Sequence, residues 1–284
     1  MAKTLQELSL IDDFLFCEVM KDPIAAKGLV EIILGKQIIA VQVSKTQEEV
    51  KTEPVYRGIR LDIYLEDDQN TVYNVEVQVS NTGNIPKRSR YYQSLIDYKR
   101  IPAGDPDYNK LPPSYIIFIC NFDLFGQGRY KYEFEYRCLQ DFSLPFGDQA
   151  IKIVLNTRGE NDNEESAELI RLLKYIADSS EGSVDKAADE RIRYLGEKVY
   201  EVKHSEEREA NFMLLQEKMT LERQEGRLEG EKLGLRRGKR EGRMEGKREK
   251  SGEIARNMLA KGLDRELIVE VTGLSEAEIE ALRK

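Results

Sequence analysis

The stretch RLDIYLEDDQNTVYNVEVQV, residues 60–79, decides the fold of this chain because it has the pattern of one β-hairpin. Apolar and polar side chains alternate from Leu61 to Leu65, which is typical of a half-buried strand. The block Asp67–Asn70 (DDQN) carries the side chains that favour tight turns, and alternation resumes from Tyr73 to Val79. The sequence therefore predicts two antiparallel strands folded about Gln69.

This register brings two acidic residues face to face. The apolar side chains of both strands then form one face, and the other face pairs Asp62 with Glu76, Tyr64 with Asn74, and Arg60 with Gln78. Directly opposed carboxylates, about 5 Å apart at Cβ, destabilise a sheet unless a cation neutralises them. Mg²⁺ is commonly held by one or two carboxylates and water. We therefore expect a divalent-metal site at Asp62 and Glu76. The alternative, two solvated carboxylates on an ordinary strand face, remains open at this point.

Four short motifs in this order resemble a known nuclease family. Asp62, thirteen intervening residues and then Glu76-Val77-Gln78 resemble the D…(D/E)-x-K core of the PD-(D/E)XK nuclease superfamily, with Gln in place of Lys. A D-x-x-F motif (Asp13–Phe16) and an Arg/Tyr-rich segment (KRSRYYQSLID, residues 87–97) flank this core. Together they resemble the recombination-promoting nuclease (Rpn) branch, whose members are also labelled transposases. The resemblance covers roughly residues 5 to 180.

The resemblance implies roles for individual residues. Asp62, Glu76 and the carbonyl of Val77 would hold Mg²⁺, or Mn²⁺ or Ca²⁺, and Gln78 would orient the attacking water. Asp13 would place a further carboxylate near the metal. The family commonly has Lys after the Phe of its first motif, whereas this chain has Cys17, so one phosphate contact is expected to be missing.

Composition narrows the chemistry further. The chain has 284 residues and a single histidine, His204, which lies in a charged helical segment and is expected to be solvated. Catalysis by a histidine-based triad or a histidine-rich zinc site is therefore not expected. The three cysteines are widely spaced and are expected to be reduced core residues of a cytoplasmic protein. No segment has the length and apolarity of a membrane span, and nothing at residues 1–20 has the pattern of a signal peptide.

The order of the remaining elements predicts an α/β domain at residues 1–180, with a restriction-endonuclease-like mixed sheet flanked by helices. Residues 5–35 have helical patterns, with Asp12 or Asp13 as an N-cap and Gly35 as the end of the second helix. A buried central strand is predicted at Tyr115–Cys120. Further strands are predicted at residues 38–43, 130–138 and 151–155, a helix at 164–178, and a bulge or turn at Gly58.

A basic and aromatic helix is predicted directly after the hairpin, from Pro86 or Lys87 to about Lys99. Such residues suit a phosphate backbone and stacked bases, and the candidate nucleic-acid contacts are Lys87, Arg88, Arg90, Tyr91 and Tyr92, with Arg60 from the hairpin. Alternatively, the tyrosines are core residues and the arginines are solvated. The net charge of −8 means that only a local patch can attract DNA.

Residues 181–250 form a second region, a long charged helical arm. Glycine recurs at every fourth position from Gly226 to Gly246. Each glycine costs a helix about 1 kcal/mol relative to alanine, and packing against a partner helix would compensate, so we expect a homo-oligomer through residues 185–250. A flexible, partly helical arm is the alternative. Residues 221–250 hold 4 Lys and 7 Arg against 7 Glu, a mixed pattern that favours solvation over DNA binding.

Residues 251–284 are expected to form a small module of three helices with a helix-turn-helix outline, including a capping box at Ser275–Glu278. The acidic last helix (Glu276, Glu278 and Glu280) is poorly suited to a major groove. This favours a role in packing or assembly.

The leading functional hypothesis is a metal-dependent DNA endonuclease, with recombination or attack on foreign DNA as the roles that the resemblance suggests. Because Gln78 cannot supply the charge of the family's Lys, chemistry is expected to be slower or to need a second cation, unless Arg60 compensates. The first alternative is a non-catalytic interaction or DNA-binding protein on a nuclease fold. The second is an integrase-type transposase with three carboxylates on an RNase H-like fold, which the single tight hairpin pair disfavours.

Overall fold

The computed structural model describes residues 3–50, 59–98, 100–185 and 189–282, so the predicted bulge at Gly58 lies outside the described residues. The chain forms two compact units, residues 1–212 and 213–284. The helices and strands, in chain order, are α1 (Asp13–Val19), α2 (Pro23–Leu34), β1 (Val41–Val50), β2 (Ile59–Asp67), β3 (Val72–Gln78), α3 (Ile85–Tyr98), the 3-10 helix η1 (Tyr108–Lys110), β4 (Ser114–Cys120), β5 (Lys131–Phe134), β6 (Ala150–Asn156), α4 (Ala167–Ala177), α5 (Glu190–Lys203), α6 (Glu206–Ala260), α7 (Arg265–Thr272) and α8 (Glu276–Ala281).

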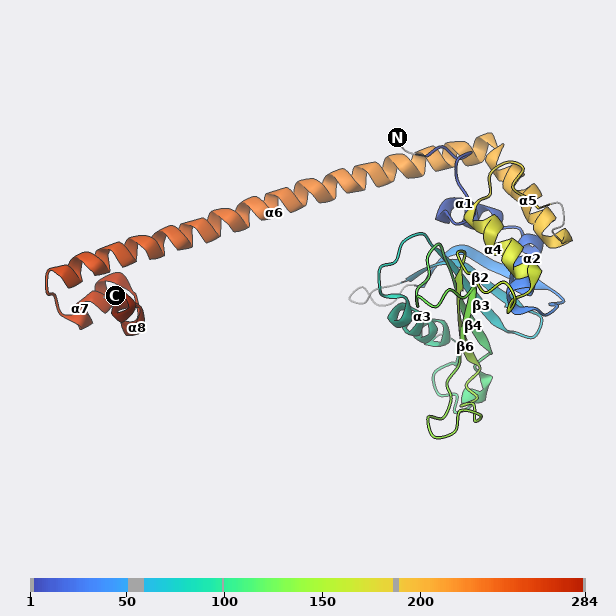
Figure 1. Ribbon diagram of the computed structural model, residues 1–284, viewed down its shortest axis with the longest axis horizontal. Coiled ribbons are helices and arrows are strands. Elements are labelled where there is room, and N and C mark those ends of the chain that lie inside the picture. Colours follow the sequence, from blue (N-terminus) through green and yellow to red (C-terminus); the bar gives the residue numbers. More distant parts are fainter. Residues whose placement is uncertain (1–2, 51–58, 99, 186–188, 283–284) are drawn as a thin grey trace. The chain divides into compact units, whose positions relative to one another are not determined.

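The first unit is built on a mixed six-stranded sheet of order β1-β2-β3-β4-β6-β5. The β1–β2, β2–β3 and β5–β6 pairs are antiparallel, whereas β3–β4 and β4–β6 are parallel. Helices α1, α2, α4 and α5 lie on one side of the sheet and α3 lies on the other (Figure 1). The predicted α/β class with a mixed sheet and flanking helices is therefore confirmed.

The hairpin has the predicted register. Ile63 pairs with Val75, Tyr64 with Asn74, and Leu65 with Tyr73. The turn is closed by Asp67, whose carboxylate accepts the backbone N–H groups of Gln69 and Thr71, and Asn70 takes a positive φ of 60°. This is the local chemistry for which Asp and Asn are favoured in turns.

The prediction of a half-buried hairpin is wrong for β3, because helices cover both faces of the sheet. Asn74 is fully buried and Glu76 is 3% exposed, on the face that carries α3. The face opposite contributes Tyr73 and Val75 to the main core. Strand β4 is buried on both faces, as its continuous apolar sequence predicts.

Several predicted boundaries shift. The first helix begins only at Asp13, and the Asp12 carboxylate accepts the N–H of Ser9 and pairs with Lys3 rather than capping the helix. Gly35 ends α2 with a φ of 64°, as predicted. Strand β1 starts at Val41 rather than residue 38. The charged region forms two helices, α5 and α6, and the helix predicted separately at residues 253–260 is the end of α6.

The second unit contains most of α6 together with α7 and α8. A small core of Ala255, Ile268, Leu274 and Ile279 holds the three helices together. Ser275 and Glu278 form the predicted capping box. Glu278 also pairs with Arg248, and Glu280 pairs with Arg265 at 3.1 Å, so these two acidic side chains of α8 are engaged within the unit.

Three further predictions concern the histidine, the cysteines and membrane-spanning helices. His204 is exposed at the end of α5, where it stacks on Tyr200, as expected for a solvated residue. Cys17 and Cys120 are buried, but Cys138 is only half-buried and lies in the irregular segment after β5, so the expectation of a core residue is wrong there. Among the helices of the described ranges, none has the length and apolar character needed to cross a bilayer.

Candidate metal and nucleic-acid site

Asp62 and Glu76 meet at the end of the β2–β3 hairpin. The backbone N–H of Asp62 donates to Oε1 of Glu76 at 3.2 Å, and the N–H of Val77 donates to Oδ2 of Asp62 at 3.2 Å. Each carboxylate thus accepts an amide of the opposite strand. This reciprocal arrangement fixes both carboxylates between the two strands, where the sequence predicts them.

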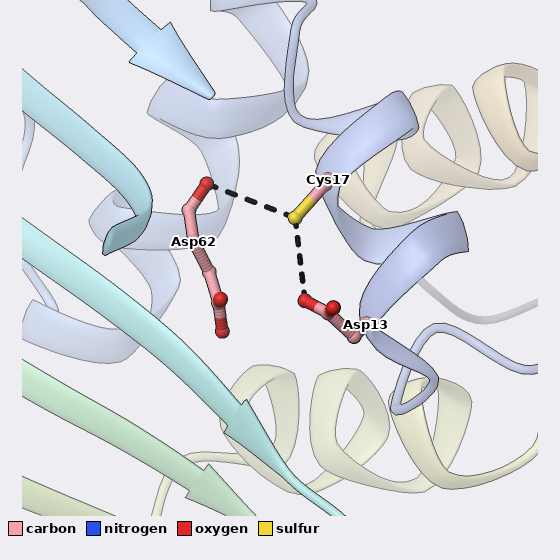
Figure 2. A group of neighbouring side chains, drawn as sticks. All are labelled: Asp13, Cys17 and Asp62. Carbon is pink, nitrogen blue, oxygen red and sulfur yellow. Dashed lines mark hydrogen bonds between the residues drawn. The ribbon is translucent and has the colours of Figure 1, made fainter. Parts of the chain in front are cut away.

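Helix α1 adds two side chains to this position. Figure 2 shows Asp13 and Cys17 on one side of the helix, directed towards Asp62. The Cys17 Sγ lies 3.5 Å from Oδ1 of Asp13 and 3.7 Å from the backbone carbonyl of Asp62. One ligand atom from each of Asp13, Cys17 and Asp62 lies within 4.8 Å of the others. These three residues, together with Glu76, are called the acidic site below.

The electrostatics of the acidic site disfavour two charged carboxylates. Burial raises the pKa of Asp62, and the neighbouring charges of Glu76 and Asp13 raise it further, against the lowering effect of the Val77 amide. Burial also raises the pKa of Glu76, although the Asp62 amide and the charge of Arg88 oppose this. Raised pKa values follow from desolvation and like charges, and a cation would relieve both.

The donor set fits a divalent cation. Carboxylate oxygens suit Mg²⁺, Mn²⁺ or Ca²⁺, whereas the thiol of Cys17 is a softer ligand. Beside Glu76, the Oδ1 atom of Asn74 is buried without a hydrogen-bond partner among the described residues. The carbonyl of Val77, the further predicted ligand, accepts the side-chain amide of Gln78 at 2.6 Å, which leaves the second lone pair of its oxygen for a cation.

Helix α3 brings a positive charge to the carboxylates. Arg88 is half-buried, with its guanidinium 5.0 Å from the ring centre of Phe118 and 5.7 Å from that of Tyr92. Two of its nitrogen atoms, Nε and Nη2, are buried without a hydrogen-bond partner among the residues that the structure describes. Phe118 is the partner of Glu76 in the β3–β4 ladder, so Arg88 lies near the acidic site, and its charge lowers the pKa of Glu76.

The other predicted nucleic-acid residues divide into two groups. Lys87 and Arg90 are exposed on α3, and Tyr91 is 37% exposed, so all three lie at the surface of the helix. Tyr92 is 8% exposed and stacks on Phe118 within the core. Tyr92 is therefore a core residue, as the alternative interpretation of this helix predicts for its tyrosines. Arg60 lies in β2, and its side chain is outside the described part of the structure.

Sequence reasoning missed the position of Cys17 and the burial of Asn74. Cys17 follows Asp13 by four residues on α1, and residues at this spacing share one helix face. That spacing was the available signal. However, the proximity of Cys17 to Asp62 depends on how α1 packs on the sheet, which no local pattern gives.

Comparison with protein families gives two matches. A model of the PD-(D/E)XK nuclease family transposases matches residues 15–226, which include Asp62, Glu76 and all of α3 but begin after Asp13. A model of the C-terminal HTH domain of the Rpn/YhgA-like nuclease family matches residues 248–284. No curated protein and no solved structure matches the chain.

Proposed function

Because the chain belongs to the PD-(D/E)XK nuclease family transposases, we propose that it is a metal-dependent DNA endonuclease. The observation that carries the proposal is the reciprocal contact of Asp62 and Glu76 across the hairpin, with Asp13 beside them. Mg²⁺ is the proposed cofactor, with Mn²⁺ or Ca²⁺ as substitutes. Recombination and attack on foreign DNA are the proposed cellular roles, in the cytoplasm.

The chain's own residues prepare the site for a cation and a phosphate. Asp62 and Glu76 supply carboxylate ligands that the two strand amides hold in place. A bound divalent cation lowers the pKa of a water ligand and neutralises charge on the scissile phosphate. Arg88 contributes a second positive charge on the side of Glu76. Arg88 is proposed to compensate for the charge of the missing Lys, a role that the sequence predicts for Arg60.

Gln78 is proposed to orient the water. Its side-chain amide now donates to the carbonyl of Val77 at 2.6 Å, so it is already anchored next to the proposed ligands. An amide can position a water molecule by hydrogen bonding. It supplies no charge, and the rate is therefore expected to be below that of a site with Lys.

DNA is proposed to approach along α3 and the C-terminal module. Lys87, Arg90 and Tyr91 are exposed on α3, directly after the loop that leaves β3. Cationic side chains such as those of Lys87 and Arg90 provide the salt-dependent affinity for phosphates. The match of the C-terminal HTH domain supports a second DNA contact. Self-association through residues 185–250 remains part of the proposal.

A non-catalytic DNA-binding or interaction protein is the second candidate. It is favoured by Gln78, which replaces the motif's Lys and whose side chain engages the carbonyl of Val77. Binding without cleavage would require only the basic surface and the HTH domain.

Nicking of supercoiled plasmid tests the proposal. Wild type, Asp62→Ala and Asp68→Ala are compared with Mg²⁺, Mn²⁺, Ca²⁺ or EDTA. Asp68 is an exposed acid in the turn of the same hairpin and serves as the matched control. We expect metal-dependent nicking that is lost in Asp62→Ala and kept in Asp68→Ala. Folded wild-type protein that nicks with none of the metals would support the second candidate.

A further inference from the structure

A pocket on the α3 side of the sheet is lined by aromatic side chains. It has a volume of about 350 Å³ and lies between α3, strands β4 and β6, the end of β5, and the segments that precede and follow β5. Phe125, Phe134 and Tyr136 line it together with Phe118. This volume is in the range of small-molecule pockets, about 300–1,000 Å³. The cavity is called the aromatic pocket below.

The aromatic rings are accessible rather than buried in the core. Phe125, Phe134 and Tyr136 are 37%, 43% and 57% exposed. The rings of Phe125 and Phe134 lie 5.2 Å apart, and Tyr132 supports Phe125 from 4.8 Å. Large apolar side chains that are exposed together usually mark a binding surface.

Two cations line the aromatic pocket. Lys152 holds its ammonium group 5.2 Å from the ring centre of Tyr136 and donates to the carbonyl of Ala150 at 2.8 Å. Arg90 lines the pocket from α3 and forms no ion pair among the described residues. The acid of the lining, Glu135, is paired with Arg137. Burial lowers the pKa of Lys152, and the charges of Asp148 and Asp97, which lie outside the lining, oppose this. The pocket itself therefore favours an anionic ligand with an aromatic ring.

The aromatic pocket adjoins the acidic site through shared elements. Phe118 lines the pocket and also lies under the guanidinium of Arg88, whose charge acts on Glu76. Phe118 is also the β4 partner of Glu76 in the parallel ladder, and helix α3 supplies both Arg88, over the ring of Phe118, and Arg90, which lines the pocket. A strand bound at the acidic site would thus have the pocket beside it.

We propose that the aromatic pocket binds an unpaired nucleotide of a DNA strand held at the acidic site, an inference that rests on the proposed function. The base stacks on Tyr136 and Phe134, and Arg90 and Lys152 contact the neighbouring phosphates. Bases stack on aromatic side chains irrespective of sequence, and a base reaches such a pocket only when it is unpaired. The site therefore selects single-stranded, frayed or mismatched DNA over intact duplex.

A nucleotide fits this lining better than a segment of another protein. A nucleotide carries its phosphate next to its ring, which matches two cations beside exposed aromatic side chains. An apolar helix or strand would leave Arg90, which forms no ion pair among the described residues, without a counter-charge.

Equilibrium binding in EDTA tests the inference without cleavage. Fluorescence anisotropy gives the Kd of full-length protein for a labelled single-stranded oligonucleotide and for the duplex of the same sequence. We expect Tyr136→Ala and Phe134→Ala to raise the single-strand Kd roughly tenfold, as removal of one stacking ring typically does. The conservative variant Tyr136→Phe keeps the ring and should retain wild-type affinity.

Phe142→Ala is the matched control, because Phe142 is 68% exposed in the same segment but is not part of the pocket lining. Equal weakening by Phe142→Ala, or unchanged single-strand affinity in Tyr136→Ala and Phe134→Ala, would overturn the inference.

Photocrosslinking locates the bound base. A single-stranded oligonucleotide with 5-iodouracil, irradiated with the full-length protein, is expected to crosslink to peptides containing Phe125, Phe134 or Tyr136. Crosslinks confined to other regions would contradict the inference. Failure of the two proposals is distinguishable: pocket-dependent binding without nicking removes only the nuclease, whereas nicking without pocket-dependent binding removes only the nucleotide pocket.

Discussion

Asp62 and Glu76 show how one pair of residues serves both the fold and the proposed chemistry. Each accepts an amide of the opposite strand at 3.2 Å, so the carboxylates take part in joining β2 to β3. The same burial raises the pKa of both groups. Without a cation, the ionised pair therefore opposes folding, and this cost depends on pH.

The stability of the metal-free protein is predicted to fall as pH rises. Both pKa values are raised above the usual 3.8 and 4.5. Between the usual and the raised value of each group, the folded chain therefore binds more protons than the unfolded chain. Stability is then greatest when both groups are protonated and is lost as pH rises through the raised values. A tenfold change in the proton affinity of one group corresponds to about 1.4 kcal/mol, so we expect a loss of at least about 1 kcal/mol between pH 5 and pH 8 in EDTA.

Asp62→Asn should reduce this loss, because the amide stays neutral and its oxygen still accepts the Val77 amide. Urea unfolding at both pH values measures the difference. Asp68→Asn is the control, since Asp68 is exposed and its pKa is lowered, mainly by a hydrogen bond from Gln69. Identical pH dependence in wild type and Asp62→Asn would show that the pair does not oppose folding.

At the scale of the element, the glycines of the two units differ in how closely neighbouring atoms pack against them. A Cβ added at any glycine from Gly226 to Gly246 meets no atom within 4 Å. At Gly159, by contrast, a Cβ would lie 2.4 Å from the ring of Tyr130 and 2.7 Å from its backbone nitrogen. No contact among the described residues of the second unit requires glycine at these positions of α6. The first unit, by contrast, needs Gly159 for close packing.

Gly230→Ala is predicted to stabilise α6, since alanine favours a helix by about 1 kcal/mol over glycine at an open position. Gly159→Ala is predicted to destabilise the first unit, because backbone atoms cannot move aside easily. Thermal unfolding followed by circular dichroism measures both. If Gly230→Ala instead weakens self-association in light scattering, a partner helix packs against the glycines, as the proposed oligomer requires.

At the scale of the whole molecule, α6 belongs to both units. Its first residues pack on the first unit, where Phe212 contacts Phe14 with ring centres 5.0 Å apart and Arg208 pairs with Glu18. Its last turns form the core of the second unit with α7 and α8. The elements of the acidic site all lie in the first unit, and the HTH match lies in the second.

A chain ending at Gln216 is therefore predicted to keep the first unit folded, because it retains Phe212, but to bind DNA more weakly. We expect an unfolding midpoint within a few degrees of wild type and a Kd for duplex DNA raised roughly tenfold at about 100 mM salt, with a smaller salt dependence because fewer phosphates are contacted. Calorimetry and anisotropy titrations measure these quantities. Unchanged affinity would assign the C-terminal module to packing or assembly instead.

The sequence by itself determined the hairpin, its register and the buried strand β4 beside it. Alternation of side chains, the Asp67–Asn70 turn and the apolar run at Tyr115–Cys120 are local signals, and the structure has these elements where they predict them. The motif order also identified the family before any fold was known. The facing positions of Asp62 and Glu76 followed from the same register, because pairing in a short hairpin is fixed by its turn.

Only the tertiary structure decided which side chains surround that pair. Cys17 lies 45 positions from Asp62 in the chain but 3.7 Å from its carbonyl, because α1 packs on the sheet beside β2. Helix α3 covers the other face, buries Asn74 and Tyr92, and places Arg88 over the ring of Phe118, the strand neighbour of Glu76. These contacts join segments that are distant in sequence, and their geometry arises from packing of helices on both faces, which periodicity within one segment does not encode.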